Sequence, residues 1–261
     1  MLTALAGAAA IAFGLMFLMW VVQQATRNAA WGDVGWAFSF GLLAGWYTFI
    51  AGGNDDRSLA LCLAAGLWAA RLGSHLTARI FHEPGEDGRY RHFRATWGGN
   101  IGAKFLGFFL MQAFFEVVFS VPFLLIARNA APFPHPLEVA AAALLVVAVL
   151  GETIADRQLR RFKADPGNRG TTCRAGLWRV SRHPNYFFEW LVWVAWAVAA
   201  SAHGGWGWAA WGAPVLILFL LVKVTGIPPT EAQSIRSRGD DYRSYQQETS
   251  AFFPWFPRKS A

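Results

Sequence analysis

The sequence predicts an all-helical membrane protein, a polytopic bundle of about seven transmembrane helices. Three observations support this prediction. Hydrophobic residues make up 55% of the 261 residues and charged residues only 15%, whereas soluble domains carry about a quarter charged residues. Apolar segments of membrane-spanning length recur along the whole chain. Lys and Arg gather in alternate loops between these segments, as in polytopic membrane proteins.

The composition also limits the classes of function. Basic loops at one membrane face account for the net charge of +7, so this charge does not indicate nucleic-acid binding. Cys62 and Cys173 provide neither a disulfide framework nor a metal quartet, and no other metal-ligand cluster occurs in the sequence. No internal repeat, Walker loop, nucleophile elbow or dinucleotide-binding glycine motif is present. We therefore expect residues 1–261 to form a single integral membrane domain without a metal site.

Seven apolar segments are predicted to span the membrane. The first lacks the basic start and the cleavage site of a signal peptide, so we expect it to be retained as a helix. The second is short and rich in glycine, and the sixth is short. The seven predicted spans are residues 2–22, 34–51, 58–80, 105–127, 137–155, 187–201 and 208–224.

Asp33, Arg71 and Glu116 are charged residues at or inside these spans, where exposure to lipid is costly. Asp33 precedes the second span, either as a helix cap or as a functional acid. Arg71 lies in the middle of the third span and is expected to face the bundle interior. Gln112 and Glu116 share a face of the fourth span, so Glu116 must face inward, pair with a cation or be protonated. Glu116 is therefore a candidate proton donor, and a structural ion pair with Arg71 is the alternative.

Two further segments carry clustered charges. The polar loop at residues 81–100 contains an E-D-x-R-Y core followed by another arginine. The fifth span ends in a polar stretch in which two acids four residues apart share one helical face. Taken alone, each segment is equally well or better explained as a solvated, salt-bridged surface. The residues concerned are Arg89, Tyr90, Arg94, Glu152 and Asp156.

The densest polar segment is residues 176–190, GLWRVSRHPNYFFEW. Arg182 and His183 are potential cations at the start of a helix that a proline opens. Cations together with free backbone N–H groups at a helix start suit a phosphate. Asn185 and Glu189 lie on one face of the next turn, where they can hydrogen-bond the rest of such a ligand. The alternative is a basic membrane-edge anchor followed by a capped helix.

The segment from Arg182 to Tyr186, with Glu189 after it, resembles the RHPNYxGE signature of the steroid 5-alpha-reductase-like membrane proteins. The likeness is greatest to their bacterial branch, DUF1295, and isoprenylcysteine carboxyl methyltransferases carry a related segment. The start of the second span, the E-D-x-R-Y loop, the end of the fifth span and the C-terminal segment are similar to the same branch. The resemblance extends from about Asp33 to Trp255, and Phe188 stands where the family usually has glycine.

The resemblance implies a membrane enzyme that uses NADPH to reduce a C=C bond in a steroid, isoprenoid or acyl lipid. Glu116 and Asp33 are then candidate catalytic proton donors or carbonyl partners. The Gln-Glu pair with which animal steroid reductases engage their substrate has no counterpart here, which favours an isoprenoid or acyl lipid. Most of the implied cofactor residues fall within residues 137–256. The first set is Arg182, His183, Asn185, Tyr186 and Glu189, and the second is Glu152, Asp156, Arg89, Tyr90, Arg94 and Tyr242.

Two other functions remain open from sequence. One is an S-adenosylmethionine-dependent membrane methyltransferase, because such enzymes share the RHPxY segment, and the other is a non-enzymatic lipid-binding protein. With seven spans, the positive-inside rule places the N-terminus outside and the C-terminus in the cytoplasm, with Arg57 and Arg128 as exceptions. The polar motifs then face the cytoplasm, where nucleotide cofactors are found. We expect a protein of the bacterial inner membrane, with lipids and a hydrophobic substrate as partners and no nucleic acid.

Overall fold

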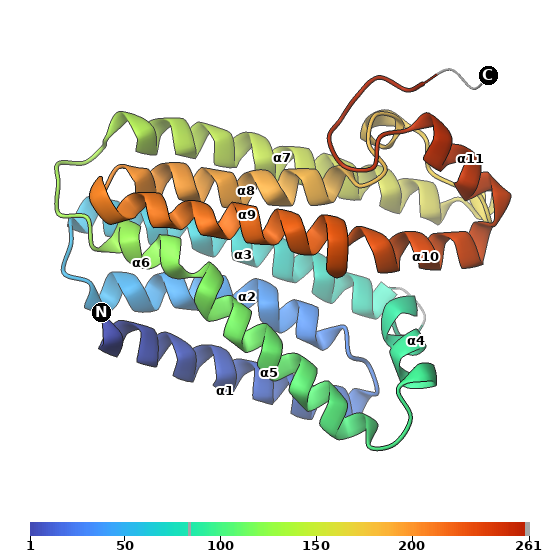
Figure 1. Ribbon diagram of the computed structural model, residues 1–261, viewed down its shortest axis with the longest axis horizontal. Helices are drawn as coiled ribbons and strands as arrows, with labels where there is room; N and C mark the ends of the chain where they lie inside the picture. Colours follow the sequence, from blue (N-terminus) through green and yellow to red (C-terminus); the bar gives the residue numbers. More distant parts are fainter. Residues whose placement is uncertain (83–84, 259–261) are drawn as a thin grey trace. The chain divides into compact units, whose positions relative to one another are not determined.

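A computed structural model describes residues 1–82 and 85–258 of the chain (Figure 1). Helices account for most of these residues, and none of the residues so described forms a β-strand. The all-helical prediction is therefore confirmed. Part of the loop predicted at residues 81–100, and the C-terminal Ala261, lie outside the described residues.

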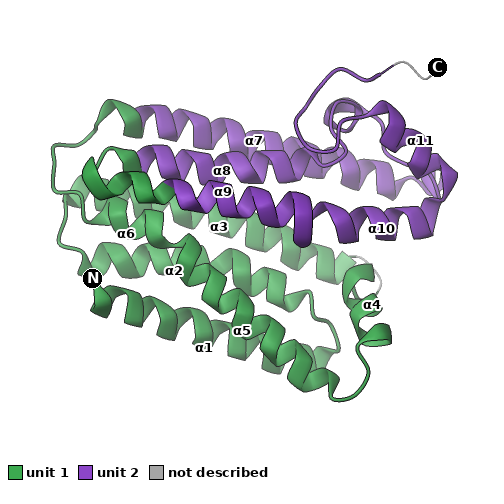
Figure 2. Ribbon diagram, in the orientation of Figure 1, with its two compact units in different colours: residues 1–138, 200–210 green, residues 139–199, 211–261 purple. Residues whose placement is uncertain are grey.

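The chain divides into two compact units (Figure 2). Unit 1 comprises Met1–Glu138 and Ala200–Ala210, and unit 2 comprises Val139–Ala199 and Trp211–Ala261. The long helix α7 (Pro136–Ala164) begins in unit 1 and continues in unit 2. Most of the residues that the sequence assigns to a cofactor therefore fall in unit 2.

Unit 1 is built around α2, which packs against both α1 and α3, while α5 packs along α1. Small residues allow the close approaches. A Cβ atom added at Gly32 of α2 would lie 2.5 Å from the Phe109 ring of α5, and one at Gly73 of α3 would lie 2.5 Å from the Phe38 ring. The helices of this unit are α1 (Leu2–Thr26), α2 (Trp31–Ile50), α3 (Asp55–His82), α4 (Gly88–Thr96), α5 (Ile101–Phe119) and α6 (Val121–Ala127), followed after α8 by most of the 3₁₀ segment η3 (Gly205–Trp211).

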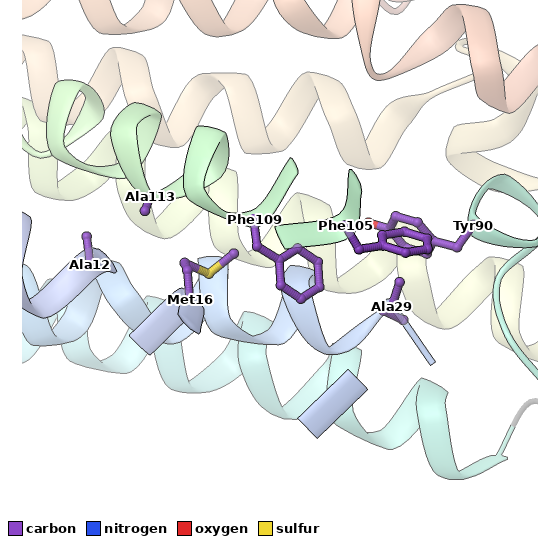
Figure 3. Packing of buried hydrophobic residues seen from close by; sticks show 8 residues of the cluster. Ala12, Met16, Ala29, Tyr90, Phe105, Phe109 and Ala113 are labelled. Carbon is purple, nitrogen blue, oxygen red and sulfur yellow. The ribbon is translucent and has the colours of Figure 1, made fainter. Parts of the chain in front are cut away.

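A buried cluster in unit 1 joins the polar loop to the helices (Figure 3). Tyr90, from α4, lies next to Phe105 of α5 with ring centroids 6.3 Å apart. The guanidinium of Arg94 lies over the Phe105 ring at 4.6 Å. The loop is thus anchored by aromatic packing as well as by charge. The buried members of the cluster are Ala12, Met16, Ala29, Ala30, Tyr90, Phe105, Phe109 and Ala113.

In unit 2, α7 and α8 pack closely. Phe188, which stands where the RHPNYxGE signature has glycine, lies at the contact between them. A Cβ atom added at Gly151 of α7 would lie 2.3 Å from the Phe188 ring of α8. The ring therefore occupies space that a missing side chain on α7 leaves open. The Trp178 Nε1 donates to the Ala155 carbonyl at 2.9 Å, and Trp190 Nε1 donates to the Pro214 carbonyl at 3.0 Å. These two bonds join the segment before α8 to α7, and α8 to α9.

The rest of unit 2 is a chain of shorter elements. A π-helical turn, η4, joins α9 to α10, and α10 packs against α11. The elements after α7 are η1 (Pro166–Asn168), η2 (Gly176–Arg179), α8 (Pro184–Ser201), α9 (Gly212–Phe219), η4 (Leu220–Val224), α10 (Ile227–Arg238) and α11 (Asp240–Glu248).

Five helical stretches among the described residues are long and apolar enough to cross a membrane, as expected of an integral membrane protein. Each contains one of the predicted spans. The second and sixth predicted spans also form helices, α2 and α8, but these are not among the five. Asp33 in α2, and Asn185 and Glu189 in α8, make these two helices less apolar. The five stretches are Leu2–Thr26, Asp55–His82, Ile101–Ala127, Pro136–Ala164 and Gly205–Arg238.

Candidate functional site

The polar residues at the start of α8 meet α10 and α11 at one carboxylate, that of Glu231. Its Oε1 accepts a hydrogen bond from Arg182 Nε at 2.6 Å and lies 3.2 Å from His183 Nε2. The Tyr242 hydroxyl donates to the same oxygen at 3.3 Å, and Gln246 Nε2 donates to Oε2 at 2.6 Å. Glu231 of α10 therefore links four side chains from two other segments of unit 2, the start of α8 and α11.

Arg182 also forms hydrogen bonds to the end of α11 and to the residues that follow it. Its Nη1 donates to the carbonyls of Gln246 at 3.0 Å and Thr249 at 2.6 Å, and its backbone N–H donates to the Ser250 carbonyl at 2.8 Å. Its Nη2 forms no hydrogen bond to any described residue. One edge of the guanidinium thus remains able to bind an anion.

His183 is buried, with 3% of its surface exposed. Burial lowers the pKa of its imidazole, although Glu231 opposes the change. A neutral ring that donates from Nε2 to Glu231 fits this environment. The ring stacks on Tyr186 with centroids 5.2 Å apart, and the Tyr186 hydroxyl lies 3.1 Å from Thr230 Oγ1. His183 and Tyr186 thus connect α8 to the start of α10.

The two acids predicted on α7 lie beside α8. Glu152 and Asp156 are both buried, and Asn185 Nδ2 donates to Asp156 Oδ1 at 3.4 Å. The Asn185 Oδ1 accepts a bond from the Tyr186 backbone N–H at 3.1 Å. Glu189, one turn further along α8, accepts a bond from Trp193 Nε1 at 3.1 Å. Asn185 therefore joins Asp156 of α7 to the α8 motif.

Tyr242 and Tyr245 of α11 close this network. Burial raises the pKa of both phenols, and for Tyr242 the charge of Glu231 adds to the effect. Both therefore remain protonated and act as hydrogen-bond donors. The Tyr245 hydroxyl donates to the carbonyls of Trp178 and Ser181, which fixes the approach to α8.

The residues predicted in the 81–100 loop form a second cluster, in unit 1. Asp33 accepts hydrogen bonds from the Tyr90 hydroxyl at 2.6 Å and from Arg89 Nη2 at 3.1 Å. Asp87 caps α4 and pairs with Arg79 at 2.6 Å and with Arg89 at 3.1 Å. Burial alone would raise the pKa of the Asp87 carboxyl, but Arg89 and Arg79 lower it to about 2. Burial, reinforced by Asp33, raises the pKa of Tyr90 well above its usual value.

Arg94 belongs to the same cluster. It donates to Glu86 at 2.7 and 3.0 Å and to Gln23 Oε1 at 3.0 Å. Glu86 in turn accepts a bond from the Ala29 backbone N–H at 2.7 Å. These contacts tie the loop to α1 and to the start of α2, as a salt-bridged loop would. A cofactor role for Arg89, Tyr90 and Arg94 therefore remains a prediction.

Glu116, on α5 of unit 1, takes no part in the hydrogen-bonded cluster around Asp33. Its side chain is fully buried, so the prediction that it faces inward is confirmed. Neither carboxyl oxygen accepts a hydrogen bond from the described residues, and no ion pair with Arg71 is formed among them. Arg71 itself is half-buried.

Glu231, Gln246 and Thr230 were not identified from the sequence. The Thr230 hydroxyl lies 3.1 Å from the Tyr186 hydroxyl. Glu231 follows Arg182 by 49 positions in the chain, and no local pattern pairs residues over such a separation. Among the described residues, no group of three or more His, Cys, Asp or Glu side chains is placed to hold a metal ion.

Comparison with known proteins gives one match. The model of a family described as "Protein of unknown function (DUF1295)" matches residues 19–249. No curated protein matches the chain, and no solved structure does.

Proposed function

The chain belongs to the DUF1295 family, and from this premise we propose that it is a membrane-embedded, NADPH-dependent reductase of a C=C bond in a hydrophobic substrate. One observation above all supports the proposal. The residues that the sequence motif associates with a cofactor are joined by contacts within unit 2. Asp156 meets Asn185, and the adjoining residues Arg182 and His183 meet Tyr242 at Glu231.

The donor set of this network suits a dinucleotide. Arg182 Nη2 forms no hydrogen bond within the described residues, and Arg179 is exposed at the end of η2. These two cations are able to hold phosphate groups. Asn185 and Tyr186 supply an amide and a phenol one turn deeper for the neutral parts of the ligand. When bound, NADPH supplies the hydride, and the protein's part is to hold it and to deliver a proton.

Of the two candidate proton donors, the contacts favour Glu116. Both carboxyl oxygens of Asp33 are already occupied, by the Tyr90 hydroxyl and the Arg89 guanidinium, in fixing α4 against α2. Glu116 is fully buried, and no cation within the described residues stabilises a charge on it. An isolated charge at membrane depth is costly, so a protonated side chain is the cheaper state. We therefore assign the proton to Glu116.

Replacing Asn185 by alanine is expected to weaken NADPH binding about tenfold while leaving the melting temperature nearly unchanged. A hydrogen bond to a charged or buried group contributes about 1–2 kcal/mol, and the bond from Asn185 to Asp156 is long, at 3.4 Å. Glu189→Ala is expected to weaken binding to a similar degree. The measurement is titration of NADPH into each purified variant, with melting curves recorded alongside.

Gln247→Ala is the matched control, because Gln247 is an exposed amide on α11. It should bind NADPH like wild type. Wild type that binds S-adenosylmethionine and no NADPH would replace the reductase by a methyltransferase. Wild type that binds neither would favour a lipid-binding protein. Normal binding by both α8 variants would place the cofactor elsewhere.

We also propose seven spans, with the N-terminus outside and the C-terminus in the cytoplasm. The grounds are the excess of Lys and Arg in the loops of one side, to which Arg57 and Arg128 remain exceptions. In a bacterial host, a C-terminally fused alkaline phosphatase is expected to be inactive and a fused fluorescent protein to be bright. Active phosphatase at that position would reverse the orientation.

A further inference from the structure

Unit 1 contains a buried polar site whose oxygen atoms have no donor among the described residues. Both carboxyl oxygens of Glu116 and the Oε1 atom of Gln112 are buried without a hydrogen-bond partner. The two residues lie four apart on one face of α5. Three acceptor atoms on one helix face are therefore unsatisfied together.

One serine of the neighbouring helix lies within reach of the carboxyl group. Ser39 of α2 is fully buried and close enough to Glu116 for a hydrogen bond. Its hydroxyl proton is used, however, because Ser39 Oγ donates to the Trp36 carbonyl at 2.8 Å. One turn further along α5, Ser120 Oγ is paired with the Tyr47 hydroxyl at 2.9 Å. The lack of donors is thus confined to the level of Gln112 and Glu116.

Buried polar atoms without partners are rare in folded proteins and reduce stability. A hydrophobic side chain in place of Glu116 would avoid this loss of stability. The stability of the fold therefore does not explain why a carboxyl group stands at this position. Because all the unsatisfied atoms are oxygens, the missing partner must donate hydrogen bonds. A partner that enters a membrane-spanning helix bundle must also be largely apolar.

We propose that Gln112 and Glu116 bind the hydroxyl group of a lipid alcohol. A hydroxyl has one proton to donate and lone pairs to accept. It can donate to Gln112 Oε1 and accept from a protonated Glu116, so that each side chain gains a partner without burying a charge. A ketone or an ether has no proton to give to Gln112. A lipid amine would bury an ion pair, whose desolvation is costly.

This site deepens the proposed function, and its identification as a substrate site rests on that function. In the reductase, the alcohol would be the polar end of the lipid substrate, which Glu116 and Gln112 orient. Alcohol binding itself needs no NADPH. Alcohol binding measured without the cofactor therefore tests the alcohol site alone. The NADPH titration tests the reductase proposal separately.

The test compares three probes of equal chain length, 1-dodecanol, dodecyl methyl ether and dodecylamine, on the full-length protein in detergent. The melting temperature of wild type is expected to rise with dodecanol and to remain unchanged with the other two. Gln112→Leu should weaken dodecanol binding about fivefold, the value of one hydrogen bond. Glu116→Leu should raise the melting temperature of the ligand-free protein and abolish the shift with dodecanol.

Gln24→Leu is the matched control, since it removes an exposed amide from α1, and it should keep the full response to dodecanol. Equal shifts with alcohol and ether would show apolar binding without a hydroxyl site and would overturn the proposal. A response to the amine alone would overturn it in favour of an ion pair. No response to any probe would mean that the carboxyl holds only a proton or internal water. Should Glu116→Leu fail to fold, Gln112→Leu decides between these outcomes.

Discussion

Replacing Arg57 by alanine is expected to destabilise the protein by about 3–5 kcal/mol, the cost of breaking a buried ion pair from one side. Arg57 is 1% exposed and donates to both oxygens of Glu138, at 2.5 and 3.3 Å. Its remaining protons go to the carbonyls of Asn129, Ala131 and Pro132. The substitution leaves a buried carboxylate without its cation and several carbonyls without their donor. It also detaches the start of α3 from the loop between α6 and α7.

Arg128→Ala is the matched control for this prediction. Arg128 is exposed close to the same loop, and its side chain forms no ion pair within the described part of the chain. Its loss should change the free energy of unfolding by less than about 0.5 kcal/mol. The measurement is denaturant or thermal unfolding in detergent, read by tryptophan fluorescence. Equal unfolding free energies for the two variants would contradict the stabilising role of Arg57 and its buried contacts.

The double variant Arg57→Met with Glu138→Leu tests the same pair from another direction. Replacing both members of a buried ion pair by apolar residues is often neutral or stabilising. The double variant should therefore be more stable than Arg57→Ala, although the carbonyl acceptors still lose their donor. If the double variant is as unstable as Arg57→Ala, Arg57 contributes to the free energy of unfolding through its carbonyl contacts and not through the ion pair.

The second large effect is expected at Glu231. Its replacement by alanine removes the one carboxylate that holds Arg182, His183, Tyr242 and Gln246 together. We expect a loss of about 3 kcal/mol in the free energy of unfolding, because Arg182 then lies largely buried without its counter-charge. NADPH binding should fall at least tenfold, since Arg182 and His183 lose the group that orients them.

Glu231→Gln distinguishes orientation from charge. The amide oxygen can still accept from Arg182, so part of the stability should return, whereas the charge that compensates Arg182 is lost. Asp240→Ala serves as the control, because Asp240 pairs with Arg243 on the exposed surface of α11, where ion pairs contribute about 0–1 kcal/mol. Unfolding and NADPH titration are measured on all three variants. Wild-type stability and binding in Glu231→Ala would show that the network has no part in either.

Much of the fold was predictable because burial leaves a local trace in the sequence. Long apolar runs gave the five stretches suited to the membrane, and the cost of a charge in lipid predicted that Glu116 faces inward, which its complete burial confirms. The polar motif at the start of α8, which we propose holds a cofactor, was likewise visible, since its residues are neighbours along the chain. The hydrophobicity of a short segment shows whether it avoids water or lipid. This preference can be read from the sequence without knowing the rest of the fold.

Pairing between distant residues was decided only by the tertiary structure. From sequence, Arg57 was an exception to a charge rule, yet it lies against Glu138. Nothing in the local sequence singles out Glu231, yet it meets four side chains. Phe188 looked like a departure from a family motif, yet Gly151 on another helix leaves room for its ring. Many groups could pair with a charge or leave room for a bulky ring. Which of them lies close enough depends on the path of the whole chain and not on the local composition.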